Sequence, residues 1–353
     1  MSATNTNYLT NLFRLLAGNR MLRPLVVSYC VTASCNLNCC YCEDYGARRN
    51  ATNGMAPLSL ADAKRLLGIV RKRTDSLIFT GGEPLLYPDL EALVAFARRD
   101  LRFNSLTLLS NGTLLPEHMD VLRHLHRLVI SLDAVDPQVW DQTIRGAPGT
   151  AQAIINTIAS TARQGGARVI VHCVLMPETL VQAQAVLAFC IAHGILFSCS
   201  PQSVNNWPRY ELLVSAEYHA FIARLIALKQ SGAPIFGSLP YLRLMMDSQP
   251  YPCYPLLAPR VLPDGGLAYP CRPIERSGNA HGGQANLLDA GDWQEAVRRS
   301  VELYGSPPLT CGSCYQQCYV EPSLMQARPL GLLREIIAFP SSRHAGIVTY
   351  APG

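Results

Sequence analysis

Six short apolar segments alternate with helical patterns between residues 25 and 202, and this alternation constrains the fold more than any other feature of the chain. The segments are rich in Val, Ile, Leu and Thr, as strands covered on both faces usually are. They lie at residues 25–32, 76–80, 105–110, 127–133, 168–176 and 196–201. Repeated βα units predict a parallel sheet, either doubly wound or closed part-way into a barrel, with ligands beyond the carboxyl ends of the strands.

Composition excludes several classes of protein. Of the 353 residues, 49% are hydrophobic and 16% are charged, which excludes a disordered chain. The net charge of +5 is spread along the sequence and does not indicate a nucleic-acid partner. No apolar run reaches the roughly 18 residues needed to cross a bilayer. The N-terminus lacks a secretory signal pattern, so we expect a cytoplasmic protein.

Residues 1–24 predict an amphipathic helix. We expect its apolar positions to pack on the domain as an ordinary capping helix, while a weak association of this helix with a membrane surface is the alternative. The apolar and basic positions are Leu9, Leu12, Phe13, Leu16, Arg14, Arg20 and Arg23.

The loop after the first strand holds a cluster of cysteines. The chain has 13 cysteines, and an odd number concentrated in this way favours a metal protein in a reducing compartment over a disulfide framework. Cys35, Cys39 and Cys42 can point three thiolates at three corners of a [4Fe–4S] cluster and leave one iron open. A zinc site or fortuitous core cysteines are the alternatives. We interpret the remaining Cys40 as a residue that does not bind iron.

This loop resembles the cluster loop of the radical S-adenosylmethionine (SAM) superfamily, with Tyr41 at the aromatic position before the last cysteine. Three later motifs match that family in order: Gly81-Gly82-Glu83-Pro84, Ser110-Asn111-Gly112-Thr113, and Ser131-Leu132-Asp133 with Ile144-Arg145-Gly146. The resemblance covers residues 25–202. It implies SAM contacts from Tyr41, Gly81, Gly82, Glu83, Ser110, Asn111, Ser131, Asp133 and Arg145.

Elementary chemistry agrees with these roles. Glycines at 81 and 82 allow a backbone to approach a ligand closely. The Glu83 carboxylate can pair with an ammonium group, and the Arg145 guanidinium can hold a carboxylate with two hydrogen bonds. Taken alone, the Gly81–Glu83 segment also fits an ordinary turn between a strand and a helix.

A second cysteine set lies near the C-terminus. Cys253, Cys271, Cys311 and Cys314 resemble the auxiliary-cluster extensions called SPASM and Twitch, and the shorter Twitch-like form predicts one auxiliary [4Fe–4S] cluster. A structural zinc ribbon built by the same four residues is the alternative. Cys318 either replaces one ligand or is spare. The small core residues are expected to be Cys30, Cys173, Cys190 and Cys199.

The resemblance therefore implies an α/β fold: an incomplete (β/α)6 radical SAM barrel with a small C-terminal iron–sulfur domain. We expect an N-terminal helix (1–24), the partial barrel (25–210), a helical connection (211–250), the auxiliary-cluster domain (251–325) and a tail (326–353).

The implied activity is reductive cleavage of SAM to a 5′-deoxyadenosyl radical that abstracts hydrogen from a substrate carbon. We predict an oxidoreductase that acts on a small natural-product or sugar-like molecule, with the auxiliary cluster accepting an electron and flavodoxin or ferredoxin as reductant. A peptide maturase and a lipid- or isoprenoid-modifying enzyme are alternatives. A two-cluster electron carrier or redox sensor is the alternative that is not an enzyme. The sequence assigns no acid–base residue among Glu43, Asp44, His172 and Tyr254.

Overall fold

The predicted parallel sheet is confirmed in the computed structural model, which describes residues 2–44, 55–144, 149–204, 207–274, 285–308, 311–312 and 314–328. Each βα segment pairs with the next in parallel register, from β1 to β6. The six strands are β1 (Val27–Thr32), β2 (Ser76–Gly81), β3 (Ser105–Ser110), β4 (Arg127–Ser131), β5 (Arg168–Leu175) and β6 (Leu196–Pro201).

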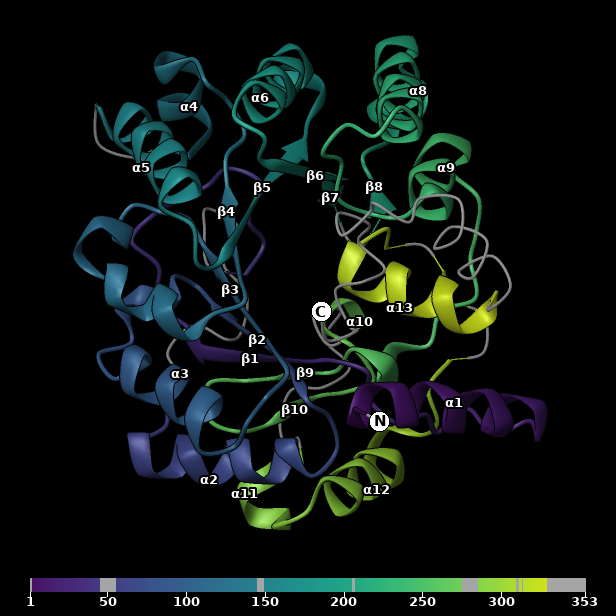
Figure 1. Cartoon of the computed structure of the whole chain (residues 1–353). Coiled ribbons are helices and arrows are strands. Elements are labelled where there is room, and N and C mark those ends of the chain that lie inside the picture. The colour runs from purple at the N-terminus through teal and green to yellow at the C-terminus, as the bar shows by residue number, and fades with distance from the viewer. Residues whose placement is uncertain are drawn as a thin grey trace.

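Helices connect these strands and cover the outer side of the curved sheet (Figure 1). The connecting helices are α2 (Leu60–Arg71), α3 (Leu90–Arg99), α4 (Pro137–Ile144), α5 (Thr150–Gln164) and α6 (Leu180–Ala192). Short 3₁₀ turns lie at η1 (Pro84–Leu86), η2 (Leu115–Glu117), η3 (Met119–His124), η4 (Pro177–Thr179) and η5 (Pro255–Leu257).

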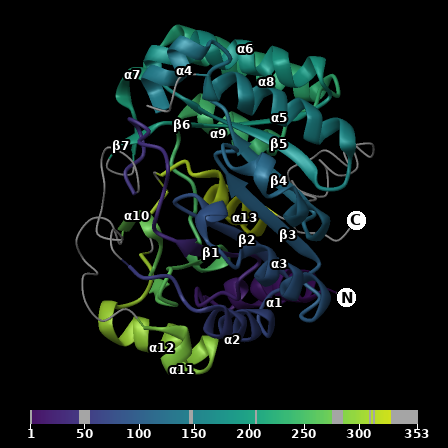
Figure 2. The same ribbon diagram turned by 90° about the vertical axis from the view of Figure 1, so that its left-hand side faces the viewer.

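The chain after β6 first forms a small hairpin and then mostly helices. These elements are β7 (Ser203–Val204), β8 (Trp207–Pro208), α7 (Tyr210–Leu213), α8 (Ala216–Gln230), α9 (Leu239–Asp247), α10 (Arg272–Ile274), α11 (Leu287–Ala290), α12 (Trp293–Tyr304) and α13 (Gln317–Ala327). Figure 2 shows α6 and α8 near one end of the sheet and α2, α11 and α12 near the other.

The C-terminal part of the chain also extends the barrel sheet. Strand β9 (Arg260–Val261) pairs in parallel with β1, and β10 (Leu267–Ala268) pairs antiparallel with β9. The strand order is β10-β9-β1-β2-β3-β4-β5-β6. The expected auxiliary region therefore shares a sheet with the barrel, and α13 returns to lie on the inner side of that sheet (Figure 1).

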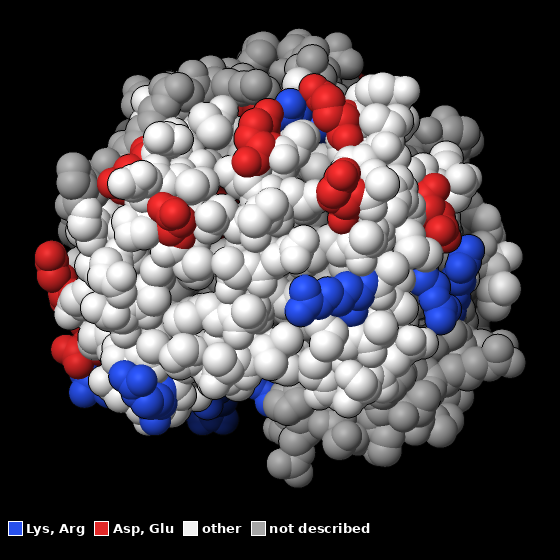
Figure 3. Space-filling model, turned by 90° about the horizontal axis from the view of Figure 1, so that it is seen from above, with Lys and Arg blue, Asp and Glu red and all other residues white. Residues whose placement is uncertain are grey.

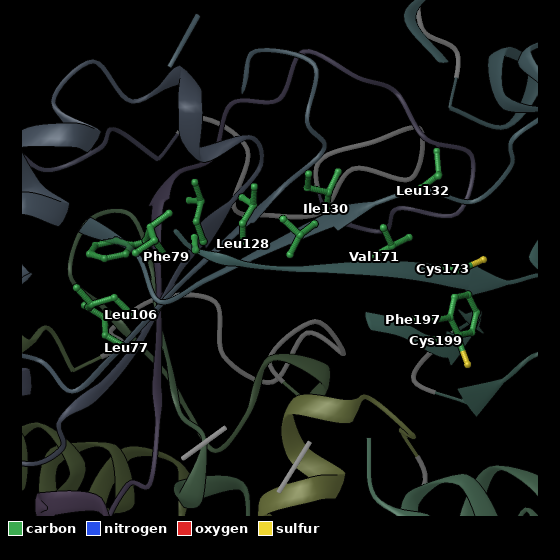
Figure 4. Packing of buried hydrophobic residues seen from close by; sticks show 14 of the residues in the cluster. Leu77, Phe79, Leu106, Leu128, Ile130, Leu132, Val171, Cys173, Phe197 and Cys199 are labelled. Carbon is green, nitrogen blue, oxygen red and sulfur yellow. The ribbon is translucent and has the colours of Figure 1, made fainter. Parts of the chain in front are cut away.

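Alternate residues of each strand point to opposite sides of the sheet, as the two-residue period of a strand requires. The outward set packs in the buried core, where Figure 4 shows part of it. The residues labelled there are Leu77, Phe79, Leu106, Leu128, Ile130, Leu132, Val171, Cys173, Phe197 and Cys199.

The inward set differs from the sequence expectation of strands that are apolar on both faces. Polar side chains alternate with the core residues and line a cavity instead. They include Thr80, Thr107, Arg127, Ser131, His172, Ser198 and Ser200. A central sheet can carry these groups because the cavity, rather than a second apolar layer, covers its inner face.

Helix α1 (Ala3–Leu16) lies against the domain, and Tyr8 and Leu15 pack on an apolar cluster there. The side chains that it buries most fully are polar: Thr4, Asn7 and Asn11. The polar side of α1 faces the protein because it hydrogen-bonds to neighbouring backbone. Among the described residues, no helix is both long enough and apolar enough to cross a membrane.

Candidate functional site

One cavity of about 480 Å³ lies between the inner face of the sheet and α13. Its wall combines the loop after β1, the inward residues of β1 to β6 and the first turns of α13. Because the carboxyl ends of parallel strands meet at one edge, four segments that are far apart in sequence reach this space together. The cavity is the natural place for the predicted chemistry.

The three loop cysteines reach the wall of this cavity, and Cys40 is not part of the lining. Burial raises the pKa of the Cys35 and Cys39 thiols, and the charge of Cys42 raises both further. A raised pKa favours the neutral thiol, so these cysteines become thiolates only when a positively charged metal group binds them. Thiolate-ligated iron supplies that charge, so the donor set fits the predicted iron–sulfur cluster.

The glycines of the second motif hold this loop against the sheet. A Cβ at Gly81 would lie 2.3 Å from the carbonyl oxygen of Thr32, and one at Gly82 would lie 2.1 Å from that of Ser34. The Gly82 nitrogen donates to the Thr32 oxygen at 3.0 Å. The sequence argument assigned these glycines to ligand approach, whereas the structure shows that close approach to the cysteine loop already requires them.

Glu83 lies behind the wall, fully buried, and its carboxylate accepts hydrogen bonds from the protein. Oε1 accepts from the Ser110 hydroxyl at 2.9 Å and from the Leu85 nitrogen at 3.1 Å, and Oε2 accepts from the Asn111 nitrogen at 2.8 Å. Burial raises the pKa of Glu83. In this arrangement the carboxylate ties the second motif to the third, while the residues at 81, 82, 110 and 111 face the cavity.

The third motif is tied in turn to the cysteine loop. The Asn111 side-chain nitrogen donates to the Asn36 oxygen at 2.8 Å, and the Asn36 nitrogen donates to the Thr113 hydroxyl at 2.8 Å. These polar neighbours of the cysteines therefore fix the position of the loop. In the sequence, Asn36 served only as an argument that the cysteines beside it do not belong to a core.

The fourth motif holds the aromatic residue of the loop. The Tyr41 hydroxyl donates to Asp133 Oδ2 at 2.6 Å, and Asp133 Oδ1 accepts from the Val174 nitrogen at 2.7 Å. Burial raises the pKa of Asp133 to about 6. Tyr41, Ser131 and Asp133 all line the cavity. The predicted Arg145 lies outside the described residues.

Comparison with known proteins agrees with this geometry. The model of the Radical SAM superfamily matches residues 29–190, which span β1 to the end region of α6. The chain carries a radical SAM domain. Domains of this family use a [4Fe–4S] cluster and SAM, and the three-cysteine loop, the glycine motif and the strand-end motifs all lie within the matched residues.

Curated relatives share part of this chain. It is 31% identical to GTP 3′,8-cyclase of Mycobacterium marinum over 229 residues, which are 62% of this chain and 62% of that protein. It is 28% identical to GTP 3′,8-cyclase of Rhodococcus opacus over 222 residues, or 60% of this chain and 62% of that protein. The chain therefore matches less than two thirds of the length of these relatives.

Solved structures share the fold over a longer stretch. Streptococcus suis SuiB bound to precursor peptide SuiA aligns with a TM-score of 0.62 at 19% identity, over 86% of this chain and 73% of that chain. The protein anSMEcpe with bound AdoMet aligns with a TM-score of 0.59 at 13% identity, over 91% of this chain and 99% of that chain. At these identities the likeness concerns the fold alone.

The second cysteine set comes together beside the radical SAM domain. Contact with Cys311 and burial raise the pKa of Cys253 far above its ordinary value, and Cys314 and Cys271 add to that rise. Cys253 thus lies near the other three predicted cysteines. Among the described residues, no three His, Cys, Asp or Glu side chains form a group that could hold a metal ion. The case for a cluster here rests on the donor type and this convergence.

Gly312 allows the Cys-x-x-Cys segment to lie close to the backbone at Tyr251. A Cβ at Gly312, between two of the cysteines, would lie 2.1 Å from the Tyr251 carbonyl oxygen. The Tyr251 hydroxyl lies 3.4 Å from Cys314 Sγ. The Cys-x-x-Cys segment therefore packs directly on the chain just before Cys253.

Cys318 packs beside Cys271 and Cys314, and its role as a replacement ligand or a spare residue stays a prediction. It is half-buried at the start of α13 and lines the cavity of the radical SAM domain. Burial raises the pKa of the Cys318 thiol to about 11, and the charges of Arg260 and Arg272 oppose that rise. The structure thus places the fifth C-terminal cysteine between the two sites. The four cysteines expected in the core, Cys30, Cys173, Cys190 and Cys199, are buried.

An ion pair joins the two sites. Asp44, two residues after the last loop cysteine, pairs with Arg272, which directly follows Cys271. Arg260 Nη1 lies 3.6 Å from the same carboxylate. Arg260 Nε also donates to Cys30 Sγ at 2.7 Å. Sequence reasoning named Asp44 as a candidate without a partner, because its partners lie more than 200 residues further along the chain.

A hydrogen-bonded chain crosses the cavity from β5 to α13. The Ser198 hydroxyl donates to Gln317 Oε1 at 2.8 Å, so its oxygen is left to accept from His172 Nδ1 at 3.1 Å. His172 Nε2 then accepts from the Ser200 hydroxyl at 3.1 Å. Burial lowers the pKa of His172 to about 4, so the ring is neutral. In the sequence, His172 is only one of several acid–base candidates. The two-residue spacing of Ser198 and Ser200 on β6 is the signal that places both hydroxyls on the same side of the sheet.

Proposed function

We propose that this protein is a radical SAM enzyme whose cluster is held by Cys35, Cys39 and Cys42. The supporting observation is that three thiols and the motifs after β2, β3 and β4 converge on one cavity inside a matched radical SAM domain. When bound, the cluster supplies one electron for cleavage of SAM to methionine and a 5′-deoxyadenosyl radical. The protein supplies the binding surface, the orientation and the exclusion of water.

The described residues support specific tasks in binding SAM. The backbone at Gly81 and Gly82 and the side chain of Asn111 present polar groups to the cavity beside the cysteines. The buried network around Glu83 keeps these groups in place without itself reaching the ligand. We assign Tyr41 and Asp133 to orienting the loop, because their hydrogen bond joins it to β4 and β5.

We also propose that Cys253, Cys271, Cys311 and Cys314 hold an auxiliary [4Fe–4S] cluster, with Arg272 and Asp44 linking it to the first site. Such a cluster has no open iron when four cysteines bind it, so electron acceptance is its natural role. This favours a net oxidation of the substrate. We assign the reductant to flavodoxin or ferredoxin and the location to a cytoplasmic, reducing compartment, where iron-binding cysteines stay reduced.

The cavity favours a small polar substrate. Its volume of about 480 Å³ is in the range of small-molecule sites, and α13 covers its inner side. His172, Ser200 and Arg127 offer hydrogen-bonding groups deep in the barrel. Because the Ser200 hydroxyl already donates to His172 Nε2, the Ser200 oxygen is the acceptor left for a substrate hydroxyl. Apolar side chains, among them Ile78, Leu109 and Ile170, share this wall. The volume and the polar groups together support a small sugar-like molecule over a long peptide.

A second candidate is the reaction named for the curated relatives, which are GTP 3′,8-cyclases. Their identities of 28% and 31%, over 60% and 62% of this chain, favour testing GTP first. The charge on the surface gives no separate support for a nucleic-acid partner, since Figure 3 shows acidic and basic side chains interspersed on a mostly uncharged face.

The test is anaerobic reconstitution of the full chain, reduction, and measurement of 5′-deoxyadenosine with SAM alone and with GTP. We expect 5′-deoxyadenosine from the wild type and none from Cys39→Ala, whereas Cys40→Ala should retain the activity of the wild type. Iron should be about eight per chain for two four-iron clusters. A reconstituted, reduced protein that releases no 5′-deoxyadenosine under either condition would remove the proposal. A GTP-dependent product would select the second candidate.

A further inference from the structure

Helix α1 turns a polar side towards the protein and an apolar stripe towards solvent. Thr4, Asn7 and Asn11 share one side of the helix at about 100° per residue, and all three are buried. Their side chains donate to the backbone carbonyls of residues 23–25 at 2.8 to 3.2 Å. The Ala3 nitrogen donates to the Asp75 carboxylate at 2.8 Å. The polar side of α1 is therefore fastened to the protein at several points.

The opposite side of α1 is an apolar stripe in solvent. Leu9, Phe13 and Leu16 follow the i, i+4, i+7 spacing of one helix face and are 44%, 72% and 85% exposed. Figure 1 shows α1 along the outside of the molecule, next to α13. A surface helix of a globular protein normally turns its apolar side inward. A stripe held outward by buried asparagines indicates a surface that is used outside this chain.

The charge around the stripe has one sign. Residues 2–24 contain no Asp or Glu, but they contain Arg14, Arg20 and Arg23, which are half-buried. The exposed Arg328 follows the end of α13, where the Tyr8 hydroxyl of α1 donates to the Met325 carbonyl at 3.2 Å. Apolar side chains flanked by arginines are the pattern that binds the interface of an anionic bilayer.

We propose that α1 docks this protein on membranes that contain anionic phospholipid, with the stripe of Leu9, Phe13 and Leu16 inserted among the lipids. The helix has 14 residues, or about 21 Å, and so lies in the interface rather than spanning the bilayer. Three side chains do not provide the roughly 800 Å² per partner of a stable dimer. The proposal is independent of the reaction assigned to the cavity.

Vesicle sedimentation with the reconstituted full chain tests this docking. The vesicles are phosphatidylcholine alone or phosphatidylcholine with about 30% phosphatidylglycerol, each at low and at high salt. We expect at least about tenfold more binding to the phosphatidylglycerol vesicles at low salt, and a loss of that gain at high salt. The triple substitution Leu9→Asn, Phe13→Asn and Leu16→Asn should reduce binding at least about tenfold.

The matched control replaces exposed apolar residues elsewhere. Val181 and Val214 are 78% and 60% exposed on α6 and beyond α7, and Val181→Asn with Val214→Asn should leave vesicle binding unchanged. Circular dichroism and iron content should match the wild type in both variants, which separates docking from misfolding.

Three outcomes overturn the proposal. The wild type fails to bind either vesicle, the triple variant binds as well as the wild type, or sedimentation equilibrium shows a wild-type dimer that the triple variant converts to monomer. The last result would assign the stripe to a contact between two copies of the chain.

Discussion

The two cysteine sets reach similar chemistry by opposite routes. The first set lies within eight consecutive residues on a loop that faces the cavity, and each neighbouring motif follows a strand end. The second set is spread over residues 253–314, and three of its members are buried. The first set lines the cavity, whereas most of the second set is buried away from solvent. The comparison suggests that the first site does chemistry and the second also holds the chain together.

The largest expected effect separates these roles. Cys35→Ala should abolish 5′-deoxyadenosine formation, by at least about a hundredfold, because an iron ligand is lost. Cys314→Ala should leave SAM cleavage within about threefold of the wild type. Formation of the substrate's product should still fall at least about a hundredfold in this variant, as it does in Cys35→Ala. Quantitative chromatography of 5′-deoxyadenosine and of product measures both. An equal loss of SAM cleavage in the two variants would contradict the assignment of different roles to the two cysteine sets.

Paired glycine substitutions come next. A Cβ at Gly82 or at Gly312 would lie 2.1 Å from a backbone carbonyl oxygen, so each Gly→Ala change must displace a cysteine segment. Gly82→Ala should lose about four irons at the first site together with SAM cleavage, whereas Gly312→Ala should lose about four at the second site alone. Iron analysis combined with electron paramagnetic resonance of the reduced protein distinguishes them. Gly68 in α2 has no atom within 4 Å of a Cβ and an ordinary helical backbone, so Gly68→Ala is a control for the space requirement.

The structural role of the second set predicts a difference in stability. A cluster at the second set closes about 60 residues and one at the loop closes about 8, which corresponds to about 2 kcal/mol more loop-closure entropy. Cys271→Ala should therefore lower the free energy of unfolding by about 2 kcal/mol more than Cys39→Ala. Anaerobic urea unfolding of the reconstituted variants measures this. A larger loss in Cys39→Ala would contradict a structural role for the second set.

The smallest effect concerns the polar chain between β5 and α13. Burial lowers the pKa of His172 to about 4, below its ordinary value of 6.5. The unfolded state then binds more protons between pH 4 and 6.5, so this histidine contributes stability above pH 6.5 that is lost as the pH falls towards 4. His172→Gln should flatten that part of the dependence of unfolding free energy on pH. Urea unfolding at several pH values measures it, with the exposed His193→Gln as control.

A spectroscopic measurement sharpens the same prediction. Nitrogen-15 spectra of labelled histidine should show His172 as the neutral Nδ1–H form at pH 7, since Ser198 is committed to donating to Gln317. Ser198→Ala should remove that preference. A protonated ring at pH 6 would contradict the assigned hydrogen-bonded chain.

Much of the barrel was predictable from sequence for a physical reason. Strands and their connecting helices leave local patterns of apolar residues, and the six segments matched the strands within about two residues at each end. The α/β fold and the radical SAM domain are confirmed. The assignment of individual ligands, including Cys35 and Arg145, stays a prediction.

The sequence by itself determined the loop of three cysteines, the order of the motifs behind it and the four later cysteines, because residue type and spacing carry that information. Only the tertiary structure decided that Glu83 faces its own protein, that Asp44 pairs with Arg272, and that His172 meets Ser198. It also decided that α1 turns its asparagines inward and Phe13 outward. Such choices depend on which distant backbone carbonyls and charges lie opposite each side chain, and no local pattern records them.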